Sequence, residues 1–252
     1  MNLFILFIIL FIIFNLHKYK KLKKNRCIKK NTYDLVIFGC SYALNFSKHA
    51  KIYSYSGSTC RGLINMNSTL KTGDSIINNL YNIDLTKNKI ILFFGNVDLL
   101  FSLIYNYNKF VNFNSINFVE ESIIKYMLYI DKIRYLFPNI NLVIFGIYND
   151  CFDDNFLLNI SKNELYYKYI QKREGIIINN YVNPTKIISK NKRSKLIKYF
   201  NSKLKYECKV RNITFKQVYN ICKYKKSSIL LDHHYDDSIM ELWEPILSDI
   251  KN

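Results

Sequence analysis

Short apolar runs, each followed closely by a turn residue, recur along the chain from residue 34 onward. The first run extends from Leu35 to Phe38 and stops at Gly39. Four apolar residues in a row, bounded by a glycine, are typical of a strand buried on both faces, as in a parallel sheet covered by helices. Similar runs follow at 51–56, 89–94, 141–145 and, more weakly, 213–219. The pattern therefore predicts five short strands.

A long helical pattern separates the third and fourth of these strands. Its apolar positions recur at helical spacing: Ile123, Ile124, Met127, Leu128, Ile130 and Ile133. The segment Asn117–Glu120 resembles a capping box at its start, and Pro138 ends the run. A strand, a helix and a second strand in this order form a βαβ crossover. The predicted fold class is therefore α/β, a three-layer sandwich with a central, mostly parallel five-stranded sheet.

The alternation continues towards the carboxyl end of the chain. Residues 151–210 form two lysine-rich helical stretches around an irregular segment at 179–190. We expect this irregular segment to pass over the active edge of the sheet, and the fifth strand follows it.

An apolar run precedes the first strand. Residues 3–14 are all apolar, and Leu16 extends the run by one further apolar position. As a helix, residues 2–16 would span roughly 22 Å. This is less than the roughly 30 Å of a membrane core, a gap that snorkelling lysines or local thinning can close. A cleavable signal peptide is the alternative, but it lacks a positively charged start and an Ala-x-Ala-like site.

Positive charge is concentrated directly after this run. Eight Lys and Arg residues, with no acid among them, lie between His17 and Lys30. By the positive-inside rule, a basic carboxyl flank keeps the chain that follows it in the cytoplasm. We therefore predict a single-pass membrane anchor at 1–16, a basic linker at 17–31 and a cytoplasmic α/β domain at 32–252.

The overall composition is that of a globular protein, with 252 residues, 49% hydrophobic and 22% charged. The net charge is +18, of which the basic linker contributes eight, so the remainder carries +10. The lysines of the remainder are scattered and lack the interleaved aromatic residues of a nucleic-acid module. We expect no specific nucleic-acid partner, and an anionic substrate or lipid surface instead.

The cysteines form no regular framework. None lies in a C-x-x-C pair, and a domain of this size does not need disulfides for stability. The six are Cys27, Cys40, Cys60, Cys151, Cys208 and Cys222. We predict that they are reduced, which agrees with a cytoplasmic domain.

The residue that follows the first strand is a candidate nucleophile. Ser41 comes two positions after Gly39. A parallel strand delivers the residues that follow it to the carboxyl edge of the sheet, where ligands bind in α/β proteins. The alternative role for Ser41 is an N-cap of the helix that begins near Tyr42.

A serine nucleophile needs a base, normally an imidazole. The chain has only four histidines. His17 belongs to the membrane flank, and His49 lies roughly 12 Å from Ser41 if both are on one helix. His233 and His234 are therefore the candidates for the base.

These residues stand in motifs that resemble the four blocks of the SGNH (GDSL-like) hydrolase family, in the family's order. The resemblance covers about residues 33–250. The four motifs are Gly39-Cys40-Ser41, the glycine at Gly57, Gly95-Asn96-Val97-Asp98 and Asp232-His233-His234. The segments 55–63 and 94–99 also resemble a subset of such proteins in large DNA viruses and bacterial glycan loci.

The resemblance implies an oxyanion hole next to a serine nucleophile. Ser41 would attack the ester, and its own amide, the amide of Gly57 and the side chain of Asn96 would stabilise the oxyanion. In the family the asparagine stands one position later than Asn96 does here. This shift predicts two alternatives, one in which Asn96 fills its family role and one in which it points away and Asp98 or water takes its place.

The resemblance also implies that Asp232 and one of the two adjacent histidines act as acid and base. The family's Asp-x-x-His spacing is altered, because Asp232 lies only one or two positions before them. Adjacent residues of an extended loop point to opposite sides. His234, two positions from Asp232, is therefore our choice for the base, and His233 is expected to face away.

The implied function is a membrane-anchored serine esterase or acyltransferase that acts on acyl, above all acetyl, esters of a glycan. No metal or cofactor is implied. One alternative is a catalytically degenerate scaffold that binds a glycan or a membrane surface. A second is a phosphoesterase of the DHH type, in which Asp232-His233-His234 would bind a metal. The cluster of Asp150, Asp153 and Asp154 is either a metal or sugar-nucleotide site or a solvated loop.

Overall fold

The computed structural model describes residues 34–68, 70–162, 187–224 and 234–251. The predicted anchor at 1–16, the basic linker at 17–31, Asp232 and His233 lie outside these ranges. Within them, no helix is both long and apolar enough to cross a membrane.

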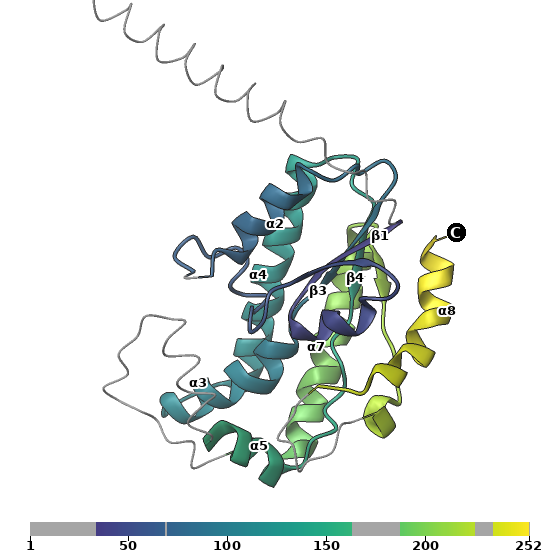
Figure 1. The fold of residues 1–252 in the computed structure, drawn as a ribbon. Helices are drawn as coiled ribbons and strands as arrows, with labels where there is room; N and C mark the ends of the chain where they lie inside the picture. Colours follow the sequence, from purple (N-terminus) through teal and green to yellow (C-terminus); the bar gives the residue numbers. More distant parts are fainter. Residues whose placement is uncertain (1–33, 69, 163–186, 225–233, 252) are drawn as a thin grey trace, which may run out of the picture. The chain divides into compact units, whose positions relative to one another are not determined.

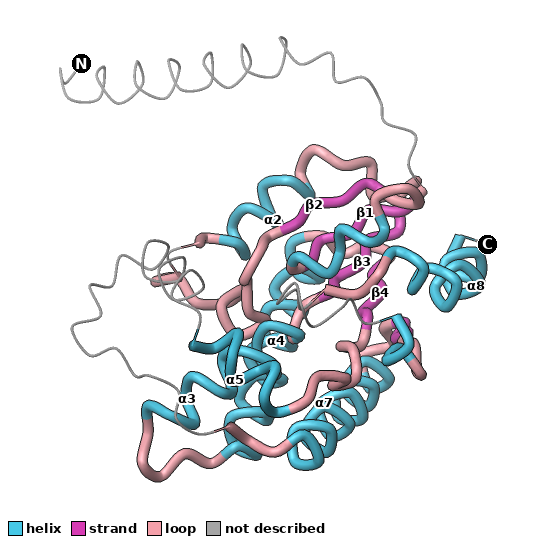
Figure 2. Tube along the Cα trace, turned by 60° about the horizontal axis from the view of Figure 1, so that its bottom comes forward, coloured by secondary structure: helices cyan, strands magenta, loops and turns pink. Residues whose placement is uncertain are grey.

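Five parallel strands form one sheet in the order β2-β1-β3-β4-β5. In Figure 2, β2, β1, β3 and β4 follow one another across the molecule. The strands are β1 (Leu35–Gly39), β2 (Lys51–Ser54), β3 (Lys89–Phe93), β4 (Leu142–Phe145) and β5 (Thr214–Lys216). The predicted number of strands and their parallel arrangement are confirmed, although β5 is shorter than the pattern at 213–219 predicts.

The register brings the ends of the first three strands to one edge. Gly39, the last residue of β1, pairs with Ser54 of β2 and with Phe93 of β3. The residues that follow these three positions therefore leave the sheet side by side. Ser41 therefore follows β1 at the carboxyl edge, as predicted, and Gly57 and Gly95 follow the two neighbouring strands at the same edge.

Helices cover both faces of the sheet. Successive strand residues face opposite sides, and because the strand residues are apolar on both sides, each face needs a covering layer. Val36 and Phe38 pack in the core layer that α2, α4 and α7 cover, whereas Leu35 and Ile37 pack in the layer that η1, α5 and α8 cover. Figure 1 shows α2 and α4 on one side of the sheet and α8 on the other. The bounds are η1 (Ser41–Phe46), α2 (Thr72–Leu80), η2 (Asp98–Ser102), α3 (Leu103–Lys109), α4 (Ser115–Leu136), α5 (Asp154–Lys162), α7 (Lys190–Val210), η3 (Ile221–Tyr224), η5 (Asp237–Ile239) and α8 (Met240–Lys251).

Two helix boundaries differ from the predicted ones. The helix after β1 is a 3-10 helix that ends at Phe46, so His49 does not lie on it. The helix α4 begins before the predicted capping box, because the side chain of Asn114 accepts hydrogen bonds from the amides of Ile116 and Asn117. Its end at Leu136, just before Pro138, agrees with the prediction.

A disulfide corrects the prediction that the cysteines are reduced. Cys151 and Cys222 are bonded at an S–S distance of 2.08 Å, whereas Cys40, Cys60 and Cys208 are free and buried. The two bonded residues are 71 positions apart, so no local sequence pattern predicts their pairing. Disulfides are rare in cytosolic proteins. The cysteines therefore no longer support a cytoplasmic domain.

We expect reduction of this disulfide to destabilise the domain. A bond that closes a loop of 71 residues restricts the unfolded chain and contributes on the order of 4 kcal/mol in the chain-entropy model. Urea unfolding with and without dithiothreitol measures the difference in the free energy of unfolding. In the Cys151→Ser variant, dithiothreitol should have no further effect. An equal free energy for the oxidised and reduced wild-type protein would contradict the prediction.

Candidate active site

Ser41 lies at a tight turn between β1 and η1. The backbone of Cys40 is extended, with φ −69° and ψ −173°, and its amide donates to the carbonyl of Phe93 at 3.2 Å. A side chain at Gly39 would lie 2.9 Å from Ala43 Cβ and from the Phe93 carbonyl, so the turn requires glycine there. Cys40 is the N-cap residue and forms no side-chain capping bond. Ser41 is therefore not the N-cap, which removes its alternative role.

Gly57 occupies a turn just beyond β2. The Tyr55 amide donates to the Gly39 carbonyl at 2.8 Å and so extends the pairing of β2 with β1. The Ser58 amide donates to the Tyr55 carbonyl at 3.0 Å and closes the turn, in which Gly57 has φ +67°. This left-handed conformation favours glycine. The turn thus lies beside the strand end that delivers Ser41.

Asn96 follows β3 and is buried, with 1% of its surface exposed. It comes directly after Gly95, whose φ of +111° and close neighbours exclude other residues. The Asn96 Oδ1 atom accepts from the Tyr148 amide at 3.0 Å, which fixes the orientation of the side-chain amide. The Nδ2 atom is buried and has no acceptor among the described residues.

The side-chain amide of Asn96 faces the nucleophile turn. Burial raises the pKa of the Cys40 thiol to about 12, although the neighbouring Asn96 amide favours the thiolate. The asparagine therefore lies beside Cys40, the residue that precedes Ser41. The high pKa also keeps the Cys40 sulfur protonated, so this thiol is not a competing nucleophile.

Asp98 faces the loop after β2. Its Oδ2 atom accepts from the Cys60 amide at 2.7 Å, and its Oδ1 atom accepts from Arg61 Nε at 3.4 Å. Burial raises the pKa of Asp98, and the charge of Arg61 opposes this shift. Both oxygens of Asp98 accept hydrogen bonds from the loop after β2. Asp98 thus connects the loop after β3, which carries Asn96, to the loop that carries Gly57.

His234 packs against the nucleophile helix. The centroid of its ring lies 5.3 Å from that of Tyr42, the residue after Ser41. The next residue, Tyr235, is buried, and its hydroxyl donates to the Asn149 carbonyl at 3.1 Å. The structure therefore places His234 beside η1, whereas Asp232 and His233 lie outside the described residues.

A residue of η1 also forms hydrogen bonds with the segment that follows His234. Asn45 Nδ2 donates to Asp237 Oδ1 at 3.1 Å and lies 3.4 Å from the Tyr235 carbonyl oxygen. In contrast, His49 forms an ion-pair contact with Glu244 of α8, with Nε2 and Oε1 3.8 Å apart. This placement agrees with its exclusion as the base.

The acidic cluster after β4 is part of a buried ion-pair network. Arg193 is fully buried and donates to Asp150 and to Asp154, both at 2.6 Å. The third acid, Asp153, accepts from the Phe156 amide at 2.7 Å. Across the described ranges, no group of three or more His, Cys, Asp or Glu residues could hold a metal ion. Asp150 and Asp154 therefore join the segment after β4 to α7 through Arg193, whereas Asp153 is exposed at the start of α5.

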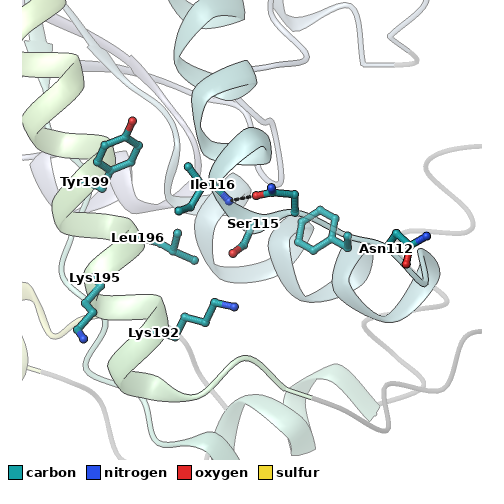
Figure 3. Close-up of a pocket in the computed structure, with 9 residues that line it drawn as sticks. Asn112, Ser115, Ile116, Lys192, Lys195, Leu196 and Tyr199 are labelled. Carbon is teal, nitrogen blue, oxygen red and sulfur yellow. Dashed lines mark hydrogen bonds between the residues drawn. The ribbon is translucent and has the colours of Figure 1, made fainter.

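A cavity of about 850 Å³ lies between the start of α4 and the first turns of α7. Both helices begin at the carboxyl edge of the sheet, because each leads into a parallel strand. Figure 3 shows the side chains of Lys192 and Ser115 pointing into the space between the two helices. The lining residues are Asn112, Phe113, Asn114, Ser115, Ile116, Lys192, Lys195, Leu196 and Tyr199.

Comparisons with known proteins find similar solved structures. No family model matches the chain, and no curated protein matches it. A solved structure of a candidate platelet activating factor from Streptococcus pneumoniae is 14% identical, with a TM-score of 0.50 over 94% of this chain and 90% of that one. A candidate acylhydrolase from Bacteroides fragilis is 11% identical, with a TM-score of 0.49 over 94% and 98%. Phospholipase A1 from Streptomyces albidoflavus is 11% identical, with a TM-score of 0.46 over 86% and 98%.

At these identities the likeness shows the fold and not the activity. The fold also has the expected internal arrangement, because the turns after β1, β2 and β3 and the segment before α8 meet at the carboxyl edge of the sheet. The chain therefore shares the α/β fold of the Streptococcus pneumoniae structure.

Proposed function

We propose that the protein is a serine esterase or acyltransferase that acts on acyl, above all acetyl, esters of a glycan. The observation that carries the proposal is the buried Nδ2 atom of Asn96, which has no hydrogen-bond partner among the described residues, in a side chain that lies beside the Cys40 thiol. A buried donor without a partner costs about 1–3 kcal/mol. An oxyanion that forms next to Ser41 would supply the missing acceptor.

In the proposed mechanism, Ser41 attacks the acyl carbonyl while the histidine base takes its proton. Negative charge develops on the carbonyl oxygen, which accepts hydrogen bonds from Asn96 Nδ2 and from the amides of Ser41 and Gly57. When the intermediate collapses, the base returns the proton to the sugar hydroxyl that leaves. Water then releases the acyl group from Ser41 in an esterase, whereas a second sugar hydroxyl accepts it in a transferase.

The glycan as substrate class has one structural support. The cavity between α4 and α7 combines two lysines with amide, hydroxyl and aromatic side chains at the same edge of the sheet as Ser41. Neither Lys192 nor Lys195 forms an ion pair with a described residue. Such a surface suits a polar chain of sugars that extends beyond the reacting ester. Membrane attachment through residues 1–16 and their basic flank is a separate part of the proposal.

Labelling with a fluorophosphonate probe tests the enzyme class. We expect one label per chain, together with hydrolysis of p-nitrophenyl acetate that is insensitive to EDTA. A chain that neither reacts with the probe nor hydrolyses the ester would be a binding scaffold. Hydrolysis of a phosphodiester that is lost in EDTA would instead identify a metal-dependent phosphoesterase. Release of acetate from an acetylated glycan, against transfer to an added sugar, separates esterase from transferase.

A further inference from the structure

The cationic side chain of Arg61 is held in a fixed position by two neighbouring residues, Asp98 and Phe118. Arg61 follows Gly57 by four residues, in the loop that Asp98 anchors. Its Nε atom donates to Asp98 Oδ1 at 3.4 Å, and its guanidinium carbon lies 4.0 Å from the ring centroid of Phe118 on α4. A guanidinium held at one edge and stacked on one face has little freedom left.

The outer edge of this guanidinium has donors without acceptors. An arginine side chain carries five N–H donors, and the only side-chain hydrogen bond of Arg61 to a described residue uses Nε. Its side chain is 23% exposed. Arg193 differs, because its Nε, Nη1 and Nη2 atoms all donate to carboxylates or carbonyls. Arg211 likewise uses all three nitrogens on Asp131 and Glu207.

Arg61 and its partner Asp98 belong to the loops after β2 and β3, the two strands that pair with β1 and end beside the nucleophile turn. Burial raises the pKa of Cys40, and the charge of Asp98 adds to this shift, so the carboxylate that holds Arg61 also acts on the residue before Ser41. The neighbouring acid Glu121 is engaged by Lys125 at 2.6 Å. Among the described residues, no acceptor binds the Nη1 and Nη2 atoms of Arg61, whose side chain is partly exposed in the loop that carries Gly57.

We propose that Nη1 and Nη2 of Arg61 bind an anionic group, a carboxylate or a phosphate, on the molecule that carries the acyl ester. This inference rests on the proposed function and narrows it to acidic substrates. A planar fork with two parallel donors matches the two oxygens of a carboxylate or phosphate. A uronic acid of a glycan would supply the carboxylate, and a phosphorylated glycerol or sugar would supply the phosphate.

Equilibrium binding tests the proposal independently of catalysis. Calorimetric titrations of the full chain use trigalacturonate, glycerol 3-phosphate and neutral xylotriose. We expect one of the two anions to bind the wild-type protein, and Arg61→Gln to weaken that binding about tenfold or more, as the loss of a charge-assisted hydrogen bond implies. The anion that binds identifies the anionic group of the substrate as a uronic acid carboxylate or as a phosphate. Arg134→Gln is the matched control, because Arg134 is an exposed arginine on α4 whose Nη1 atom donates to the Arg211 carbonyl.

Kinetics then separates anion binding from a role in folding. On acetylated polygalacturonate or a phosphorylated acetyl ester, whichever anion binds, Arg61→Gln should raise KM about tenfold with kcat within a factor of two. On p-nitrophenyl acetate, which has no anionic group for Arg61 to bind, the loss in kcat/KM should be several-fold smaller than on the acidic ester. Equal losses on charged and neutral esters would make Arg61 a structural residue. Binding of neither anion, or unchanged binding in Arg61→Gln, would overturn the inference, whereas binding without any esterase activity would overturn the proposed function alone.

Discussion

The Ser41→Ala variant is expected to lose hydrolysis of p-nitrophenyl acetate by at least about 10⁴-fold in kcat. Ser41 stands at the turn where β1 ends, next to Cys40, which the Asn96 amide approaches. Removing its hydroxyl removes the nucleophile but leaves the oxyanion donors in place, so only a low residual rate should remain. The measurement is steady-state kinetics on purified protein, together with loss of fluorophosphonate labelling.

The matched control for this variant is Ser47→Ala. Ser47 is an exposed serine at the C-cap of the same helix η1. It should keep wild-type kinetics and labelling. If Ser41→Ala retained labelling, the nucleophile would be another residue, and the proposed mechanism would be wrong.

The second large effect is expected from the base. His234→Ala should lower kcat by about 10⁴-fold, because a serine hydroxyl without its imidazole is a weak nucleophile. The ring of His234 packs against Tyr42, one residue from Ser41. His233 is outside the described residues, and the sequence predicts that it faces the other way, as alternate residues of an extended segment do. His233→Ala should therefore cost little activity.

One further variant, His49→Ala, and the comparison of His233→Ala with His234→Ala distinguish the possible causes of a loss of activity. His49→Ala removes an imidazole that contacts Glu244 instead of the candidate site, and it should keep full activity. Equal losses in His233→Ala and His234→Ala would indicate metal ligation or collapse of the loop, which EDTA treatment and urea unfolding distinguish. Retained activity in His234→Ala, with loss in His233→Ala, would assign the base to His233.

Local patterns were sufficient for the sheet and for the place of the nucleophile. A buried parallel strand needs apolar residues on both faces, and the runs that end at Gly39, Gly95 and Gly146 show this in sequence. The parallel arrangement then follows from the intervening helices, and it places Ser41 at the carboxyl edge. Helix starts were less certain, because Asn114 and Asn117 are both suitable caps and only the fold selects Asn114.

The side-chain partners within the site could not be predicted in this way. Nothing near Arg61 in the sequence indicates Asp98, which lies 37 positions away. The same holds for Arg193 with Asp150, which are 43 positions apart. These partners meet because parallel crossovers carry distant segments to one edge of the sheet. The orientation of Asn96 likewise depends on the Tyr148 amide beyond β4.

The sequence by itself determined the α/β class, the five strands and the edge at which Ser41, Gly57 and Asn96 gather, because burial period and turn residues are properties of short segments. Only the tertiary structure decided that Cys151 is bonded to Cys222, that Asp98 holds Arg61 and that Asn96 Nδ2 is buried beside Cys40 without an acceptor among the described residues. Each of these contacts joins residues far apart in the chain. Their distances depend on how the crossovers pack, which no local pattern encodes.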